Sequence, residues 1–385
     1  MKGIFRSMGL AMKHALRREI TIQYPDEKRK MPPRFRGALA IRGAIDEQTE
    51  RHVTPSPPPC QKTCPAGVAV REQNTLVAEG KIEEAFRTVQ ESNIIPGALG
   101  RICHHPCETQ CTRGLYDQSI AIRPLHRVIS DGYLKSKAKP APFERKSDDK
   151  VAIIGAGPSG LAAAYDLLKA GYGVTLFEKE KEPGGMLSMG VPRYRLPRNV
   201  LQAEIADVVA YGAELKCGVE VGKDISFADL KEGGFKAVLI AAGLQISRGL
   251  PLPGNDLDGV MLAMPFLKAV NYEEKVDIGK KVVVIGGGNV AVDVARCARR
   301  LGSEVKMVCL ESEPEIPAHS WEIEEAEEEG VDIRSSRGPK VFIGKGGKLT
   351  GVEFMECLSV FDSEGRFAPE CDEDKVEVFD AELEQ

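Results

Sequence analysis

The 385-residue sequence contains no apolar run long enough to cross a bilayer. Its first residues, MKGIFRSMGLAMKHALRR, also lack the continuous apolar core of a secretory signal peptide. These two absences argue against a membrane-spanning or exported protein, so we expect a cytoplasmic, reducing location. In such a location, clustered cysteines are more often metal or redox sites than disulfides.

A strong net charge is missing too, because 52 Lys and Arg stand against 57 Asp and Glu, which gives −5 at pH 7. This acidic balance argues against nucleic acid as a partner. The charge is uneven: residues 1–45 hold eleven Lys or Arg and three Asp or Glu, whereas residues 311–329 hold nine Glu and no Lys or Arg. The length is sufficient for two or three domains.

The basic N-terminal region begins with apolar residues at helical spacing over residues 1–18, which predicts a basic amphipathic helix. Such a helix can lie on an anionic membrane surface or dock on a partner, and an ordinary packed terminal helix is the alternative. The proline-broken residues 23–37 predict an extended strap after it. We therefore expect residues 1–45 to form a basic docking arm.

The strongest motif is VAIIGAGPSGLAAAYDLLKAGYGVTLFEK, which starts at residue 151. A short apolar strand leads into G-x-G-x-x-G, and a helix and a second strand with a terminal acid follow. The glycines let a pyrophosphate approach the N–H groups at the start of the helix, and the acid accepts hydrogen bonds from a ribose. The motif predicts a dinucleotide site with these candidate residues: Gly155, Gly157, Pro158, Ser159, Gly160 and Glu178.

A second motif of this kind, KVVVIGGGNVAVDVARCARRLGSEVKMVCLES, has the form G-x-G-x-x-A and a second strand that we expect to end at residues 309–311. The acid at its end can accept from a free 2′-hydroxyl and would repel a 2′-phosphate. Ser312 and Glu313 follow it, where NADP would favour Arg or Lys, so the motif favours NAD(H) over NADP(H). Its candidate residues are Gly286, Gly288, Asn289, Ala291 and Glu311.

Two dinucleotide sites in one chain suggest FAD in one and a nicotinamide in the other. Hydride then passes between nicotinamide and flavin, and the flavin exchanges single electrons. The sequence shows no catalytic acid–base pair, and hydride transfer does not strictly need one.

Five cysteines occur in the segments PPPCQKTCPAG and RICHHPCETQC, between residues 57 and 111. They are compatible with an iron–sulfur cluster, with zinc, with a redox thiol pair or with disulfides. Zinc would need four tetrahedral nitrogen or sulfur ligands, which these cysteines and nearby histidines can supply. Disulfides do not fit the expected reducing location.

Residues 60–385 resemble the small subunit of glutamate synthase and the N-terminal half of dihydropyrimidine dehydrogenase. The resemblance is carried in order by PCQKTCPAGV, GRICHHPCETQC, IAIRPLHR, the first glycine motif, PGGMLSMGVPRYRLP, AVLIAAG and VVVIGGGNVAVDVAR. It implies an α/β protein with a helical iron–sulfur domain (46–135), the first part of an FAD domain (151–255) and an NAD(P) domain (256–385). It also implies that residues 184–197 wrap the flavin, which adds Gly185, Met186 and Arg193 to the cofactor-binding candidates.

The resemblance further implies how the cysteines divide. Family members with two [4Fe–4S] clusters have a C-x-x-C pair where this sequence has His52 and Pro55. One cluster would therefore keep only Cys60 and Cys111. The other keeps three cysteines and a non-cysteine ligand in the following helix: Cys64, Cys103, Cys107 and His126. We expect one [4Fe–4S] cluster and leave a second open; a single rearranged cluster that uses Cys60 or Cys111, and a domain without a cluster, are the alternatives.

The segment RREITIQYPDEKRKMPPRFRG resembles the N-terminal lead of the two-cluster ferredoxin-like subunit of respiratory NADH–quinone oxidoreductase, which implies docking on a larger, membrane-associated redox complex. A family motif like GVFAAGD is missing, so we expect this chain to end before the FAD domain is complete. The function implied is an electron-transfer flavoprotein subunit that links NAD(P)H, FAD and a cluster to a partner redox subunit or ferredoxin. A glutamate synthase small subunit and a non-catalytic scaffold are the alternatives.

Overall fold

The computed structural model describes residues 45–46, 51–52, 57–136 and 140–381. The chain divides into two units, residues 1–57 and 58–385. In the first unit, strands β1 (Ile45–Asp46) and β2 (Arg51–His52) pair antiparallel. The predicted docking arm lies outside the described residues, apart from the backbone of Ile45, and so do the side chain of His52 and all of Pro55. The other helices and strands of the described residues belong to the second unit.

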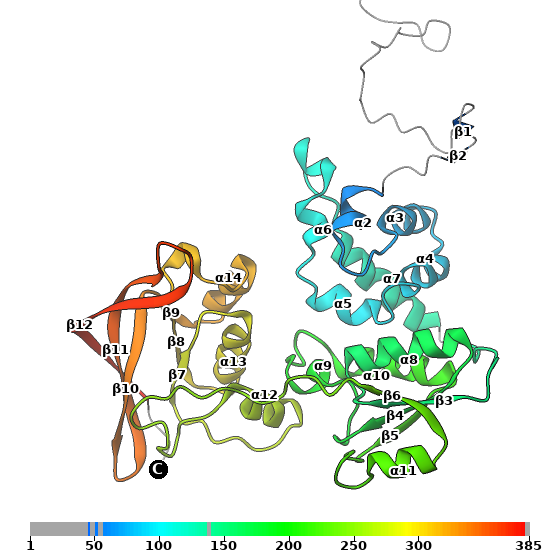
Figure 1. Ribbon diagram of the computed structural model, residues 1–385. Coiled ribbons are helices and arrows are strands. Elements are labelled where there is room, and N and C mark those ends of the chain that lie inside the picture. Colours follow the sequence, from blue (N-terminus) through cyan, green and yellow to red (C-terminus); the bar gives the residue numbers. More distant parts are fainter. Residues whose placement is uncertain (1–44, 47–50, 53–56, 137–139, 382–385) are drawn as a thin grey trace, which may run out of the picture. The chain divides into compact units, whose positions relative to one another are not determined.

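The first part of this second unit is helical, as the family resemblance implied (Figure 1). Its longest helix, α7, packs against α3, α4 and α5 around a small core that contains Ala85, Val89 and Ile129. Prolines at the first turns of α2, α5 and α6 start short helices. The helices are α2 (Pro59–Thr63), α3 (Val70–Ala78), α4 (Ile82–Gln90), α5 (Pro96–Ile102), α6 (Pro106–Thr109), the 3₁₀ turn η1 (Thr112–Leu115) and α7 (Ile122–Ser136).

A four-stranded parallel sheet follows, in the order β5-β4-β3-β6. Alternate residues of β3 face opposite sides: Ile153 packs with α8 and α10, whereas Ala152 packs with Leu230 of α11. Helices thus cover both faces of the sheet, as a doubly wound fold requires. The elements are β3 (Lys150–Ile154), α8 (Pro158–Ala170), β4 (Gly173–Glu178), α9 (Met186–Met189), α10 (Arg198–Ala210), β5 (Glu214–Cys217), α11 (Phe227–Glu232) and β6 (Phe235–Ile240).

A second parallel sheet, β7-β8-β9, carries the second glycine motif. The expected α/β class with a helical domain and two dinucleotide-type sheets is therefore confirmed. The second strand of this motif ends at Val308, however, and not at residues 309–311 as the sequence suggested. The elements are α12 (Ala263–Asn271), β7 (Lys281–Ile285), α13 (Asn289–Arg300), β8 (Glu304–Val308), η2 (Glu313–Glu315), α14 (Ser320–Glu328) and β9 (Asp332–Arg334).

The chain then forms an antiparallel meander that the sequence analysis did not anticipate: β10 (Arg337–Lys345), β11 (Lys348–Phe361) and β12 (Phe367–Asp380). Register shifts interrupt both pairings, and β12 is mostly exposed and rich in acidic residues. These features weaken the alternation of apolar and polar residues by which a strand is recognised.

A buried ionic cluster joins the segment after α9 to helices α13 and α14. Arg195 lies 2.8 Å from the carboxylate of Asp293 and 2.6 Å from that of Glu322. Both acids are less than a tenth exposed. Beside them, the Tyr194 ring lies 4.0 Å from the Arg300 guanidinium. Because Arg195 binds two buried carboxylates on α13 and α14, this contact links the domains of the two sheets.

We predict that Arg195→Ala lowers the free energy of unfolding by about 3–5 kcal/mol, because it leaves buried carboxylates without a counter-charge. Urea unfolding would measure this loss. Arg366→Ala is the matched control, because Arg366 pairs with Asp362 at the surface, with its side chain 70% exposed, and should lose at most about 1 kcal/mol. Equal losses in the two variants would contradict the prediction.

A further buried acid, Glu204 of α10, holds the helical region through the N–H groups of Gly97 and Ala98 at the start of α5. Burial raises the pKa of Glu204 to about 7, above its usual 4.5. An acid with a raised pKa in the folded state contributes stability that is complete below pH 4.5 and lost as the pH rises through 7.

We therefore predict that Glu204→Gln removes a pH dependence. Between pH 5.5 and 8, the wild type should lose about 2 kcal/mol of unfolding free energy relative to the variant, because each pKa unit corresponds to about 1.4 kcal/mol. Paired urea titrations at the two pH values test this. Parallel pH profiles for the two proteins would show that Glu204 is already ionised in the folded state.

Candidate functional site

The first glycine loop joins the end of β3 to the start of α8 with almost no free space beneath it. Gly155 has φ +104°, and a Cβ there would overlap the carbonyl oxygen of Ala241. A Cβ on Gly160 would overlap the carbonyl oxygen of Gly155. Glycine at these two positions thus allows the tight turn and the close approach of helix to strand.

A cavity of about 650 Å³ lies in front of this loop. Gly157 and Gly185 face each other there: a Cβ on Gly157 would lie 3.7 Å from the Gly185 Cα. This approach leaves the backbone open toward the cavity, which suits a phosphate held by N–H groups at the N-terminus of the 13-residue helix α8. The predicted residues among those that line the cavity are Gly155, Gly157, Pro158, Ser159, Glu178, Gly185 and Met186.

Glu178, at the end of β4, is 4% exposed and bound to the backbone around this cavity. One carboxylate oxygen accepts from the Ala156 N–H at 2.8 Å, and the other accepts from the Glu180 N–H at 3.0 Å. Each carboxylate oxygen has a further lone pair, so Glu178 can also accept from a ribose hydroxyl.

Two predicted residues have a different place. Gly160 packs beneath the loop, as its motif position requires, and does not line the cavity. The guanidinium of Arg193 donates to the Asn271 carbonyl at 2.9 Å and pairs with Glu273, at the end of α12. Arg193 therefore anchors α12 and is not among the residues that line the cavity.

The turn after β6 also belongs to this site, although no sequence motif indicated it: residues 241–245 line the cavity together with residues 219–221 after β5. The order of strands in the sheet could have indicated this turn. Ligands in open α/β sheets bind beyond the carboxyl ends of the strands, so every segment that leaves a strand at that edge is a candidate.

The second glycine loop gathers all five of its predicted residues at the start of α13. Gly286 has φ +133°, and a Cβ there would lie 3.6 Å from the Ala291 Cβ. A Cβ on Gly288 would have no neighbour within 4 Å, so space for a phosphate exists beside it. The Glu311 carboxylate lies 3.0 Å from the Cβ position of Gly287. Glu311 is thus placed beside the loop, as the terminal acid of this motif should be.

The segment before α14 closes one side of this loop. The Ala318 N–H donates to the Gly287 carbonyl at 3.0 Å, and the His319 N–H donates to the Asn289 side-chain oxygen at 3.0 Å. Asn289 therefore holds a neighbouring backbone segment while it occupies the first helical position after the glycines.

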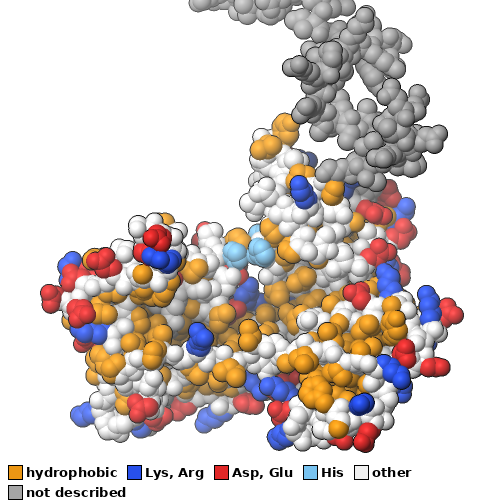
Figure 2. Space-filling view, in the orientation of Figure 1, with side chains coloured by type: hydrophobic (Ala, Val, Ile, Leu, Met, Phe, Trp, Pro, Cys, Tyr) orange, Lys and Arg blue, Asp and Glu red, His pale blue; other side chains and the backbone are white. Residues whose placement is uncertain are grey.

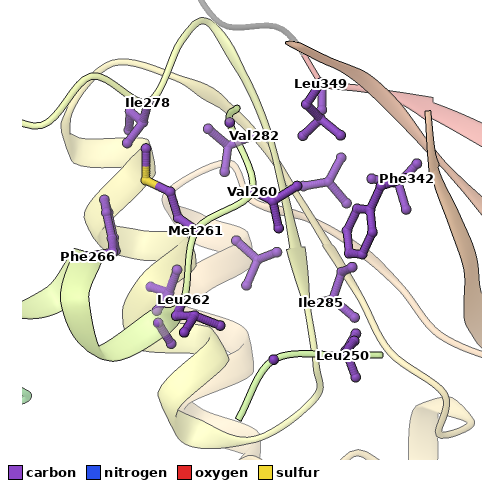
Figure 3. A pocket seen from close by; sticks show the side chains of 18 of the residues that line it. Leu250, Val260, Met261, Leu262, Phe266, Ile278, Val282, Ile285, Phe342 and Leu349 are labelled. Carbon is purple, nitrogen blue, oxygen red and sulfur yellow. The ribbon is translucent and has the colours of Figure 1, made fainter. Parts of the chain in front are cut away.

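A larger cavity of about 720 Å³ lies elsewhere, between β7 and the meander. Figure 3 shows its aliphatic and aromatic side chains, among them Val260, Ile285 and Phe342. The lining also includes Ser247, Arg248, Asn255 and Lys281, but it contains no glycine of either loop, so this cavity is not the predicted dinucleotide site.

The cysteines form two groups. Cys64 follows α2, and Cys103 follows α5. Burial raises the pKa of the Cys107 thiol to about 12, and the neighbouring charges of Glu108, Cys103 and Cys64 add to the shift. Cys60 and Cys111 lie together at a separate hollow beside Arg71. The grouping agrees with the division that the family resemblance implied.

His126 lies on α7, where the helix packs against α5, and a Cβ on Gly100 would lie 3.1 Å from the His126 carbonyl carbon. Its side chain is buried, and its Nε2 has no hydrogen-bond partner among the described residues. Burial lowers the pKa of His126 to about 4, so the imidazole is neutral at pH 7 and can donate a lone pair. An unpartnered buried nitrogen fits an iron ligand.

Across the described ranges, no three His, Cys, Asp or Glu side chains are arranged to hold one metal ion. No helix in the described part of the chain is long and apolar enough to cross a membrane.

Comparison with known families agrees with this geometry. Residues 149–367 match the pyridine nucleotide-disulphide oxidoreductase family, and residues 38–138 match the dihydropyrimidine dehydrogenase domain II, 4Fe-4S cluster family. One solved structure, Mycobacterium tuberculosis FprA in complex with NADPH, shares the fold with a TM-score of 0.55 and 23% identity, over 62% of this chain and 70% of that one.

Three curated relatives are similar over most of this chain. The subunit beta of an NADP(+)-dependent formate dehydrogenase from Moorella thermoacetica is 36% identical, over 87% of this chain and 51% of the relative. The small chain of a glutamate synthase [NADPH] from M. tuberculosis is 31% identical, over 93% of this chain and 78% of the relative. The PreT subunit of an NAD-dependent dihydropyrimidine dehydrogenase from Escherichia coli O157:H7 is 36% identical, over 80% of this chain and 74% of the relative.

The chain spans about half the length of the first of these relatives. The matches confirm the family resemblance seen in the sequence, together with FAD and a 4Fe–4S cluster as the cofactors that it implies. With both glycine loops and the five-cysteine helical region in place, the chain belongs to the pyridine nucleotide-disulphide oxidoreductase family and carries an N-terminal 4Fe–4S domain.

Proposed function

We propose that this chain is the electron-transfer flavoprotein subunit of a redox complex, in which NADH, FAD and one [4Fe–4S] cluster exchange electrons with a partner. The observation that carries the proposal is the combination of two glycine loops, on two parallel sheets, with a cysteine-rich helical region in one structural unit. Either loop alone would be compatible with many dinucleotide-binding proteins.

The residues around the first loop would bind FAD. The N-terminus of α8 presents free N–H groups to the pyrophosphate, and Glu178 accepts from the ribose. A bound flavin takes up two electrons as hydride and releases them singly. The chain itself positions the two cofactor sites relative to each other. The ion pairs of Arg195 with Asp293 and Glu322 fix the segment after α9 to the helices that follow the second loop.

Cys64, Cys103, Cys107 and His126 would hold the cluster. The support is the grouping of the three thiols and the unpartnered nitrogen of His126. Cys60 and Cys111 form a separate pair, so a second cluster would need ligands from outside the described residues. The competing ligand set is that of a rearranged single cluster, in which Cys60 or Cys111 is one of the ligands.

A partner subunit or a ferredoxin would exchange electrons with the cluster. The names of two relatives support a subunit role, since one is a formate dehydrogenase subunit and one a dihydropyrimidine dehydrogenase subunit. We extend the proposal to a cytoplasmic location and to association with a membrane complex through residues 1–45. The glutamate synthase relative favours a second candidate, the small subunit of that enzyme.

For the nucleotide, we propose NAD(H) over NADP(H). The support is Glu311, whose carboxylate lies beside the second loop and would repel a 2′-phosphate. The relatives' names include both NADP(H) and NAD, so this choice rests on the residue and not on the relatives.

We predict that NADH bleaches the flavin faster than NADPH does, and that Glu311→Arg lowers the NADH:NADPH ratio of kcat/KM by at least about tenfold. The variant removes a charged hydrogen-bond acceptor worth about 1.5–3 kcal/mol and adds a partner for the 2′-phosphate. Anaerobic stopped-flow reduction measures both ratios. Glu232→Arg, at an exposed position of α11 in the domain of the first sheet, is the control and should leave the ratio unchanged. A wild type that prefers NADPH would falsify the nucleotide assignment.

We also predict that Cys107→Ser abolishes the cluster, that His126→Ala removes most of it and that His126→Cys retains it, because a thiolate can replace the imidazole. Iron content and the electron paramagnetic resonance spectrum of the reduced protein measure this. Cys60→Ser is the matched control and should keep its cluster. If Cys60→Ser loses the cluster and His126→Ala retains it, the rearranged ligand set is the correct one.

A further inference from the structure

A stack of aromatic rings joins the iron–sulfur loop to the domain of the second glycine loop. The rings of His105 and Trp321 have centroids 4.8 Å apart, and those of His319 and Trp321 are 4.4 Å apart with planes within 9°. His104 and His319 are nearly parallel at 5.9 Å. Figure 2 shows histidine side chains gathered at one place on the visible face. The sequence motifs did not include His319 or Trp321.

One end of this stack is fixed to the predicted cluster ligands. His104 and His105 lie between Cys103 and Cys107, and the His105 N–H points at the Cys103 sulfur at 3.3 Å. Arg123 donates to the Cys103 carbonyl at 3.2 Å, and its guanidinium lies 5.9 Å from the Trp321 ring. A displacement of the loop that carries these cysteines would therefore move the rings that contact it.

The other end is fixed to the nucleotide loop. The backbone of His319 donates to Asn289, and that of Ala318 donates to the Gly287 carbonyl. Both acceptors flank the space where a nucleotide phosphate fits beside Gly288. The rings of His319 and Trp321 thus move with the same segment that contacts the nucleotide loop.

We propose that His319 and Trp321 are positioning residues that couple nucleotide binding at the second loop to the iron–sulfur cluster. The inference rests on the proposed function and assigns it a regulatory link. Coupling of this kind is reciprocal: if cluster reduction changes nucleotide affinity, the nucleotide changes the reduction potential of the cluster by the same free energy.

The test is a redox titration of the cluster in the complete, flavin-loaded protein, with and without saturating ADP-ribose. ADP-ribose carries the adenosine and pyrophosphate of NAD but no nicotinamide, so it accepts no hydride. We expect a shift of about 40 mV in the wild type, which corresponds to about a fivefold change in ADP-ribose affinity for a one-electron couple. Trp321→Ala and His319→Ala should lose the shift, and Trp321→Phe, which keeps an aromatic ring, should retain it.

The wild type also provides a readout that needs no variant. Trp321 is the single tryptophan of the chain, so its emission reports on this contact alone. ADP-ribose should change that emission in the oxidised protein. Iron and flavin contents are measured alongside each variant, so that a general folding defect is recognised.

The outcomes separate the coupling from the proposed function. A protein that holds both cofactors and is reduced by NADH, but shows neither the potential shift nor the emission change, overturns the coupling and leaves the proposed function intact. Retention of the shift in both alanine variants overturns the role of these two residues. A protein in which NADH reduces neither flavin nor cluster overturns the proposed function and the coupling with it.

Discussion

The arrangement of the two dinucleotide-type domains depends on Arg195 and the two buried carboxylates that it binds. Burying Asp293 and Glu322 is unfavourable unless a cation is held close to both, and the burial raises the pKa of Asp293 despite the neighbouring guanidinium. A hydrophobic contact would tolerate sliding, whereas an arginine between two acids fixes both distance and direction. The segment that precedes α10 is therefore held to α13, the helix that begins at the second glycine loop.

The ion pairs around Arg195 and α13 also explain the uneven charge of the sequence. The acidic stretch 311–329 has no Lys or Arg of its own, yet several of its acids are paired. Glu329 lies 2.6 Å from Arg296 and 2.7 Å from Arg300, and Glu322 binds Arg195. The partners come from α13 and from the segment after α9, so only the folded chain shows that these charges bind α14 to its neighbours and are not simply a solvated face.

The two glycine loops and their terminal acids could be predicted from the sequence because each depends on a short stretch of chain. Gly155 and Gly286 need positive φ, and that requirement is local. Other contacts depend on distant parts of the chain. The family resemblance made Arg193 a cofactor-binding candidate, and in the structure its guanidinium binds the carbonyl of Asn271, 78 residues away in sequence. The meander β10–β12 was missed for a related reason, because its strands are stabilised by long-range pairing and carry only a weak local pattern.

Four consecutive residues before and within the first turn of α14 bring these observations together. His319 binds the nucleotide loop through its backbone and the cysteine loop through its ring, Trp321 stacks on His105, and Glu322 binds Arg195. Three segments with separate candidate roles, for nucleotide, cluster and flavin, thus contact the start of one nine-residue helix. Packed elements with polar contacts move as rigid bodies more readily than they deform. In the coupling that we propose, a displacement of α14 by any one of the three segments would therefore be transmitted to the other two, and this helix would link the sites.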